Sequence, residues 1–408
     1  TMTTIKNKDI LKFGFYGLLK NLKFFEPFLW LYFLLNGLSL LEIGTLYAIR
    51  EFIVYFFEIP SGVLADRFGR KNELVLCFIF YILSFLMFYF AENFGLFVLA
   101  ISLYGLGEAF RSGTHKAMVM EYLDINDMKE SKTQVYGLTR SYSNMGSAIS
   151  SLSAIVLVLI TPDLSYLFLI AIIPYIIDLL LVLSYPSYLN HRMDTSFNLM
   201  EFIKEGYRSV KYTLTTKTLN MTLITSSGYN AVFKTIKDYI QPIFIGLGVT
   251  LLIFSNLSVD DNVKVYIGLI YFVVHFISVF ATRYAYLLQK LISKNKIVNL
   301  MWILTGLTSI LLGVFMDNLF VVIVSFILFY VFLNIRKPYM VERIGEQSDS
   351  SKRASVLSIE SQITSLMIVV LAPLVGYLSD TFGIDIMLIC LGVSMLIIEI
   401  IFPNKKSA

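Results

Sequence analysis

Twelve long apolar runs, separated by short charged segments, divide this chain, and the pattern restricts the folds open to it. Each run holds roughly the 20 mostly apolar residues that an α-helix needs to cross a bilayer. The predicted spans lie near residues 14–38, 43–65, 72–91, 94–116, 134–160, 164–184, 220–246, 263–287, 296–315, 318–338, 354–379 and 384–402. We therefore predict an all-α polytopic membrane protein with twelve transmembrane helices.

Composition points to the same class. Hydrophobic residues make up 57% of the 408 residues and charged residues only 15%, whereas a soluble domain carries about 25% charged residues. The 34 Phe and 25 Tyr residues fit a protein rich in membrane interfaces. The net charge of +4 is spread over many short loops, so the chain is not expected to bind nucleic acid.

The sequence offers little for catalysis or metal binding. The two cysteines, Cys77 and Cys390, fall in separate apolar runs, and the chain has three histidines. Neither a disulfide framework nor a metal site is predicted from this content. The chain contains no phosphate-binding glycine loop of the P-loop type. We therefore expect no enzyme, no ATP-driven pump and no cofactor.

The charges of the predicted loops alternate between the two sides of the membrane. Loops after odd-numbered spans are short and acidic, whereas loops after even-numbered spans carry the basic residues. Positive residues stay on the cytoplasmic side, which places both termini in the cytoplasm and requires an even number of spans. A plasma membrane is the expected location, and the abundant Ile, Lys and Asn are typical of an AT-rich bacterium.

The longest predicted cytoplasmic loop, residues 185–219, separates two six-helix bundles at residues 1–184 and 220–408. Within it, apolar residues such as Phe197 and Phe202 alternate with charged residues such as Glu201 and Lys204. This pattern favours an amphipathic helix on the inner membrane surface. A solvated linker is the alternative.

A charged turn joins the second and third predicted spans. It reads Gly-Val-Leu-Ala-Asp-Arg-Phe-Gly-Arg-Lys from Gly62 to Lys71. This turn, the arrangement of six plus six spans and the long central loop resemble the major facilitator superfamily, where the turn braces the outward-facing state by gripping the eleventh helix. The resemblance implies a gating role for Gly62, Asp66, Arg67, Gly69 and Arg70. Alternatively, the basic residues serve only to orient the chain.

Several segments depart from the family pattern. Residues 282–290, after the eighth span, lack the glycines and the aspartate of the corresponding turn. Residues 376–383 read Gly-Tyr-Leu-Ser-Asp-Thr-Phe-Gly, but they lie on the predicted outer side without the bases, so no gating role is expected there. The fifth span has small residues at 144–151 that permit close packing, without the proline of many drug antiporters. Ile101 stands near the place where these antiporters carry an arginine.

Ionisable residues inside the predicted spans are candidates for function, because each costs at least ~2.5 kcal/mol at mid-bilayer. Glu26 lies near the middle of the first span without an obvious local partner. Glu108 and Arg111 share one face of the fourth span, and Lys234 and Asp238 form an i, i+4 pair in the seventh. The remaining candidates are Arg140, Asn144 and His275.

Structural roles are the alternative for most of these residues. Lys234 and Asp238 would then neutralise each other, and Glu108 would pair with Arg111 inside the first bundle. His275 would be a hydrogen-bonded packing residue. Arg336, near a cytoplasmic helix end, would extend its charge to the interface.

The sequence predicts a secondary transporter that exports an amphiphilic or lipophilic small molecule by alternating access, coupled to protons. In the family it resembles, spans 1, 4, 7 and 10 line a central cavity, which implies that the charged residues of those spans face the substrate. A desolvated carboxylate there would take up and release the coupling proton. The expected partners are the substrate, protons and lipid, and the chain is expected to act as a monomer.

Two other functions stay open. One is uptake or facilitated diffusion of a polar or anionic metabolite bound by Arg111, Arg140 and Lys234. The other is a non-transporting membrane sensor or a lipid-moving protein on the same fold.

Overall fold

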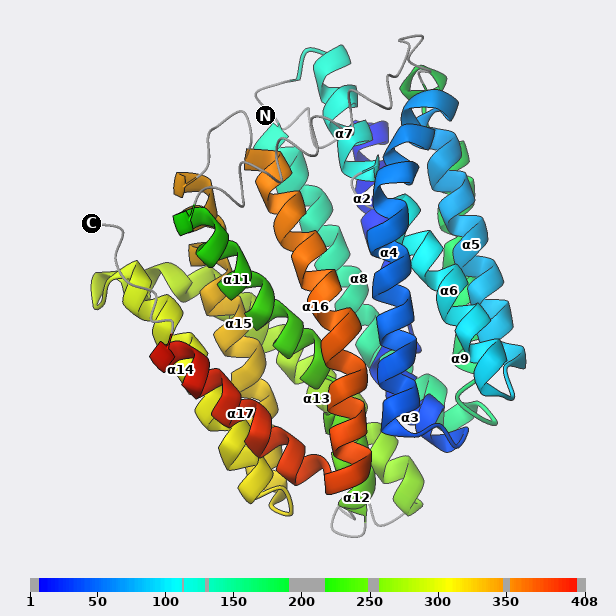
Figure 1. Cartoon of the computed structure of the whole chain (residues 1–408). Coiled ribbons are helices and arrows are strands. Elements are labelled where there is room, and N and C mark those ends of the chain that lie inside the picture. The colour runs from blue at the N-terminus through cyan, green and yellow to red at the C-terminus, as the bar shows by residue number, and fades with distance from the viewer. Residues whose placement is uncertain are drawn as a thin grey trace. The chain divides into compact units, whose positions relative to one another are not determined.

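The computed structural model describes residues 7–111, 114–128, 132–190, 217–248, 257–347 and 353–401. Within these ranges all regular secondary structure is helical (Figure 1). Every predicted span corresponds to one helix or to consecutive shorter helices, so the all-α polytopic class is confirmed. The predicted surface helix at 197–211 falls outside the described residues.

Nine spans in the described part are long and apolar enough to cross a membrane without interruption. The other three differ for visible reasons. The first and seventh spans are each interrupted and consist of shorter helices, and the second carries Arg50, Glu51 and Glu58. The departures from a plain apolar span are therefore concentrated in three segments of the chain.

The chain forms two compact units. The first comprises the described residues of 1–36 and 49–196. Its helices are α2 (Lys8–Lys20), η1 (Glu26–Phe28), α3 (Leu29–Leu35), α4 (Leu40–Phe68), α5 (Arg70–Phe90), α6 (Phe94–Arg111), α7 (Thr114–Ile125), α8 (Lys132–Ile160), α9 (Tyr166–Leu183) and η3 (Ser187–Asn190).

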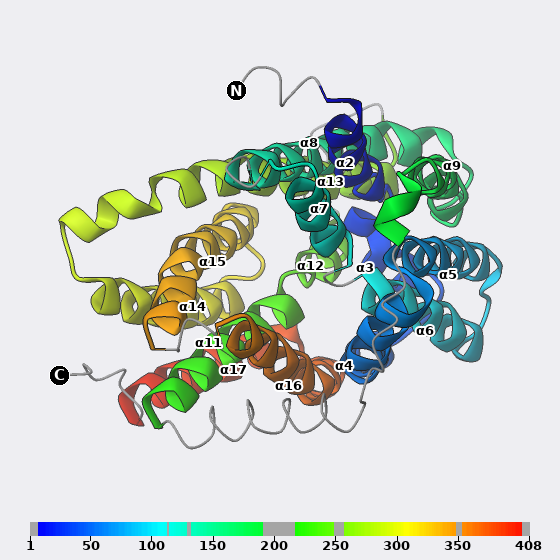
Figure 2. The ribbon, with the colours of Figure 1, turned by 90° about the horizontal axis from the view of Figure 1, so that it is seen from above.

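The second unit comprises the described residues of 37–48 and 197–408. Its helices are α11 (Lys217–Ile236), α12 (Ile240–Gly246), α13 (Val259–Tyr284), η5 (Ala285–Lys290), α14 (Lys294–Val314), α15 (Leu319–Gln347), α16 (Arg353–Phe382) and α17 (Ile384–Ile401). Seen from above, α14 lies beside α15 and α17 (Figure 2). The start of α4 also belongs to this unit, so α4 begins in the second unit and continues into the first.

Small residues bring neighbouring helices into backbone contact. A Cβ atom at Gly392 of α17 would lie 2.5 Å from the carbonyl oxygen of Gly306 in α14. A Cβ atom at Gly146 of α8 would lie 2.3 Å from the carbonyl oxygen of Leu18 in α2. Such contacts drive helix association in lipid, where the hydrophobic effect gives no preference for helix over lipid tail. The close packing predicted for the small residues of the fifth span is confirmed at Gly146.

Large apolar side chains cover much of the surface. Phe320, Ile160 and Val370 are 75%, 70% and 69% exposed. A soluble protein rarely exposes many such residues together, but a bilayer solvates them. The surface therefore agrees with the membrane location that the hydropathy predicts.

Candidate functional site

The first spanning segment is interrupted in its middle. Helix α2 ends at Lys20 and η1 begins at Glu26. The Asn21 side-chain amide closes the end of α2 by donating to the Gly17 carbonyl at 2.6 Å, and the Tyr175 hydroxyl donates to the Lys20 carbonyl at 2.9 Å. Irregular backbone at membrane depth is tolerated only where protein or a water-filled cavity surrounds it. Interrupted helices of this kind are pointers to binding sites in membrane proteins.

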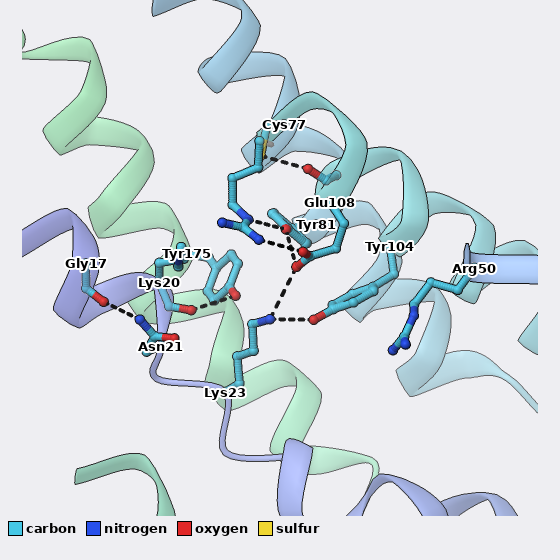
Figure 3. A network of polar contacts seen from close by, with 12 residues as sticks. Gly17, Lys20, Asn21, Lys23, Arg50, Cys77, Tyr81, Tyr104, Glu108 and Tyr175 are labelled. Carbon is cyan, nitrogen blue, oxygen red and sulfur yellow. Dashed lines mark hydrogen bonds and ion pairs between the residues drawn. The ribbon is translucent and has the colours of Figure 1, made fainter. Parts of the chain in front are cut away.

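Glu108 of α6 lies at the centre of a polar network beside this interruption (Figure 3). Its carboxylate accepts hydrogen bonds from Arg111 Nη2 at 2.6 Å, from the Tyr81 hydroxyl at 2.6 Å and from Lys23 Nζ at 3.4 Å. Lys23 also donates to the Tyr104 hydroxyl at 2.5 Å. Glu108 and Arg111 therefore form an ion pair within the first unit, and the choice between a structural and a functional role for this pair stays a prediction.

Positive charge is in excess around the interruption. Lys20, Lys23 and Arg111 supply three cations, and Glu108 forms ion pairs with two of them. The Lys20 ammonium group lies 5.9 Å from the centroid of the Tyr16 ring and forms no ion pair within the described residues. Asp178 of α9 is fully buried, and neither of its oxygens has a hydrogen-bond partner in the described ranges. Among the described residues, no carboxylate therefore lies within ion-pair distance of the Lys20 ammonium group.

A cavity of about 120 Å³ opens beside Lys20 in the first unit. It is lined by Phe13, Tyr16, Gly17, Lys20, His115, Lys116, Val119, Met120, Thr139 and Ser143. The rings of Tyr16 and His115 stack at 3.6 Å along its wall. A water molecule takes up about 30 Å³ of liquid, so the cavity has room for a carboxylate or phosphate group. Cationic, hydroxyl and aromatic groups line this cavity together.

The seventh spanning segment is interrupted in a similar way. Helix α11 ends at Ile236 and α12 begins at Ile240. Asp238, 3% exposed, lies between them. It accepts hydrogen bonds from Lys237 Nζ at 2.8 Å, from the Tyr271 hydroxyl at 2.6 Å and from the Tyr47 hydroxyl at 3.4 Å. The charge at this interruption is paired within the second unit.

A family model described as Major Facilitator Superfamily matches residues 20–329, which covers both interruptions. The chain belongs to the major facilitator superfamily. The MFS-type transporter YxaM of Bacillus subtilis is 23% identical over 389 residues, covering 93% of this chain and 90% of the relative. The MFS-type transporter MJ1317 of Methanocaldococcus jannaschii is 29% identical over 182 residues, covering 40% of this chain and 44% of that protein.

Solved transporters share the fold of this superfamily member at low sequence identity. A point mutant of the nucleoside transporter NupG aligns with a TM-score of 0.80 and 12% identity, covering 96% of this chain and 98% of that structure. A D-xylose–proton symporter aligns with a TM-score of 0.69 and 14% identity, over 97% of this chain and 98% of that structure. These likenesses support the twelve-helix fold. The family model and the transporter relatives indicate a transporter rather than an enzyme.

The predicted ion pair between Lys234 and Asp238 in the seventh span is wrong in one partner. Lys234 is exposed on α11, and the cation on Asp238 is the adjacent Lys237. The i, i+4 spacing requires a continuous helix, but α11 stops at Ile236, between the two predicted partners.

Other predicted site residues of this superfamily member are not among the residues named above for the two networks, although the His275 ring lies 6.5 Å from that of Tyr271. Glu26 is exposed at the start of η1, and its carboxylate makes no hydrogen bond or ion pair with the described residues. Asn144 is exposed on α8. His275 is exposed on α13, with its ring 6.2 Å from that of Tyr330. Arg140 belongs to α8, but its side chain falls outside the described residues.

The gating turn is described in part. Gly62, Asp66 and Arg67 lie in the last turns of α4, and their side chains fall outside the described residues. Gly69 follows α4 with φ +94°, a conformation that glycine adopts readily. Arg70, at the start of α5, forms an ion pair of 2.7 Å with Glu121 of α7. The gating role of these residues stays a prediction.

Arg336 of α15 does not extend to the interface as expected, because it is only 2% exposed. Its guanidinium lies 4.3 Å from the ring centroid of Tyr229 and 5.6 Å from that of Trp302. Aromatic faces attract a desolvated cation, which explains how a charge is accommodated there. With Glu360, Arg336 also lines a cavity of about 40 Å³ in the second unit.

Proposed function

We propose that this superfamily member is a secondary transporter for a small organic anion, and that the first helix interruption binds the anionic group. The observation that carries the proposal is the cationic cavity beside Lys20, where Lys20 and Lys116 line the wall and Lys20 has no carboxylate partner among the described residues. An unpaired charge at membrane depth is costly. A bound carboxylate or phosphate would compensate that cost.

The cavity suits an anion in two further respects. Thr139 and Ser143 line its wall, and the Ser143 hydroxyl donates to the Thr139 carbonyl at 3.1 Å. A bound anion would take the Ser143 proton in place of that carbonyl, because a hydroxyl has one proton to donate. The rings of Phe13 and Tyr16 offer apolar contact to the remainder of a molecule too large for the cavity alone. Transport by alternating access, as a monomer, is part of the same proposal.

Membrane potential bears on the direction of transport. Moving one elementary charge across 100 mV changes the free energy by about 2.3 kcal/mol. The potential therefore favours export of an anion from a negative-inside cell, whereas uptake needs a concentration gradient or a cotransported cation such as the proton. The likeness to a D-xylose–proton symporter makes proton coupling a reasonable component of an uptake mechanism. Glu26 is the carboxylate we assign to that step.

A binding screen tests the substrate class. Purified protein is heated with carboxylates, organic phosphates, nucleosides, sugars and lipophilic cations, and the unfolding temperature is recorded, because a ligand that binds only the folded protein stabilises it. We expect organic anions to raise the unfolding temperature of the wild type but not of Lys20→Gln. Lys8→Gln, at the exposed start of α2, is the matched control. Equal stabilisation of wild type and Lys20→Gln by anions would contradict the proposal.

The exposed Glu26 favours a second candidate, proton-coupled export of an amphiphilic or lipophilic cation. Here Glu26 would bind the substrate and the proton in turn. Stabilisation by lipophilic cations, lost in Glu26→Gln and kept in Lys20→Gln, would support this function and exclude the anion transporter. Proton flux into liposomes that depends on substrate and on Glu26 would complete the assignment.

A further inference from the structure

The corner between α16 and α17 repeats the corner between α4 and α5. Residues 376–383 and 62–69 share glycine, leucine, aspartate, phenylalanine and glycine at the same five positions. Both long helices end at the phenylalanine, Phe68 or Phe382, and both next helices begin directly after the final glycine. Gly69 and Gly383 have φ values of +94° and +98°. The chain therefore builds the same backbone corner twice.

The second corner lacks the bases of the first. Thr381, Ile384 and Asp385 stand where the first corner has Arg67, Arg70 and Lys71. The missing bases and the predicted location on the outer side are the two reasons to expect no gating role for residues 376–383. The contacts of Asp380 lead to the opposite conclusion.

Asp380 binds the first turn of α4. The backbone N–H of Leu40 donates to Asp380 Oδ1 at 3.0 Å, and the backbone N–H of Leu41 donates to Oδ2 at 2.7 Å. The first N–H groups of a helix have no partner within the helix and form its positive end. A carboxylate satisfies them directly, so this corner requires no basic residue.

Glycines allow the backbones of α4 and α16 to approach closely at this contact. A Cβ atom at Gly376 of α16 would lie 2.3 Å from the Leu40 carbonyl oxygen. A Cβ atom at Gly44 of α4 would lie 2.3 Å from the Ala372 carbonyl oxygen. Both distances are too short for any side chain, so the two backbones meet at this end without room for larger residues.

We propose that residues 376–383 form a latch that holds the start of α4 against α16 and must release when the transporter opens at that end. Helix α4 is a single helix of 29 residues, about 43 Å long at 1.5 Å per residue. Its two ends therefore lie on opposite faces of the membrane, with the first corner at one end and the latch at the other. The carboxylate of Asp380 and the close approach at Gly376 stabilise the state in which the latch end is closed.

Cysteine labelling tests the latch. Leu40 is 8% exposed, so Leu40→Cys, in a chain with Cys77→Ala and Cys390→Ala, should react slowly with a membrane-impermeant maleimide. Removing the charge with Asp380→Asn should raise the labelling rate roughly fivefold, the effect of about 1 kcal/mol at a helix N-terminus. Asp317→Asn removes an exposed acid from the α14–α15 loop and should leave the rate unchanged.

Gly376→Ala provides a second, independent variant, because its Cβ atom separates the helices without changing any charge. It should also raise the labelling rate. Size-exclusion profiles and helix content establish that each variant is folded, and Gly376→Ala alone decides the matter if Asp380→Asn does not fold. An unchanged rate in the folded variants, or an equal rise in Asp317→Asn, would overturn the proposal. The labelling needs no substrate, so this outcome is independent of the proposed anion transport.

Discussion

The two interrupted spans both contain irregular backbone, but the charged side chains at the two interruptions differ. At the first interruption, Lys20, Lys23 and Arg111 surround Glu108, and Lys20 has no carboxylate partner among the described residues. At the second, Lys237 and Asp238 form a pair that Tyr271 completes with a hydrogen bond. A pair satisfied by its own unit contributes structure, whereas a surplus cation leaves capacity for a ligand. This difference is the basis for our proposal that the first interruption binds the substrate and the second stabilises the fold.

The largest effect is expected from Glu108→Gln, which removes the carboxylate that Lys23, Arg111 and Tyr81 share. Two cations then lose their partner in a partly buried site, and breaking such a network costs about 3 kcal/mol. Thermal unfolding of the purified protein measures the loss. Combining Glu108→Gln with Arg111→Gln should restore part of the stability. A double variant as unstable as the sum of the two single variants would show that the network does not couple them.

A smaller loss is expected from Asp238→Asn at the second interruption. The amide oxygen still accepts the Tyr271 hydroxyl. Lys237 loses its charge partner, but its side chain is 26% exposed and stays partly hydrated, so the cost is about 2 kcal/mol. The same unfolding experiment, run beside Glu108→Gln, compares the two sites directly. Equal losses of unfolding free energy in Glu108→Gln and Asp238→Asn would contradict the distinction between the cation-rich network at the first interruption and the paired charges at the second.

Single hydroxyl deletions rank next. Tyr81→Phe removes the donor to Glu108 and the acceptor of Arg111 Nε, at 2.6 and 3.1 Å. Tyr271→Phe removes the donor to Asp238 and the acceptor of Gln241, at 2.6 and 3.1 Å. Each should cost about 1 kcal/mol in unfolding free energy. Of the two, Tyr81→Phe alone should also weaken anion binding, because it disturbs the network beside the cavity; loss of binding in Tyr271→Phe would contradict the assignment.

The smallest effect is expected from Asp178→Asn. A fully buried carboxylic acid without a hydrogen-bond partner is costly in its charged form, so a neutral amide of the same shape should change the unfolding free energy by less than about 0.5 kcal/mol. Urea or thermal unfolding measures the change. A large loss of stability would show that Asp178 is charged and pairs with Lys20, which would remove the surplus cation from the first interruption.

The spans themselves could be predicted from the sequence, because a bilayer selects for apolar length and little else. Hydropathy did not predict the interruptions. Pro27 lies in the first turn after the first break and Pro242 in the first turn after the second, and a proline disfavours a continuous helix before it. Asn21 and Tyr175, the latter from α9, complete the first break through hydrogen bonds to the end of α2. Hydropathy averages over such a short segment and reports one continuous span.

Part of the site was within reach of the sequence. Glu108 and Arg111 are spaced three residues apart and do pair, as helix geometry requires. Lys20 and Lys23 precede Glu26 at the same three-residue spacing inside an apolar run. Two basic residues inside a predicted span are a sequence signal for the cationic network. The ion pair between Lys237 and Asp238 could not be predicted, because neighbouring residues in a continuous helix point in different directions and pair only where the helix stops. The burial of Arg336 could not be predicted, because it depends on aromatic neighbours that only the tertiary structure brings together.

The position of Arg336 over Trp302 has an optical consequence. The chain has two tryptophans, Trp30 in α3 of the first unit and Trp302 in α14 of the second. The Trp302 indole is fixed by donating to the Met395 carbonyl at 2.7 Å, with a cation 5.6 Å from its ring. A displacement of that cation would shift the fluorescence of Trp302 alone. The two single variants, Trp30→Phe and Trp302→Phe, each keep one tryptophan, so the fluorescence of each variant reports on one unit alone.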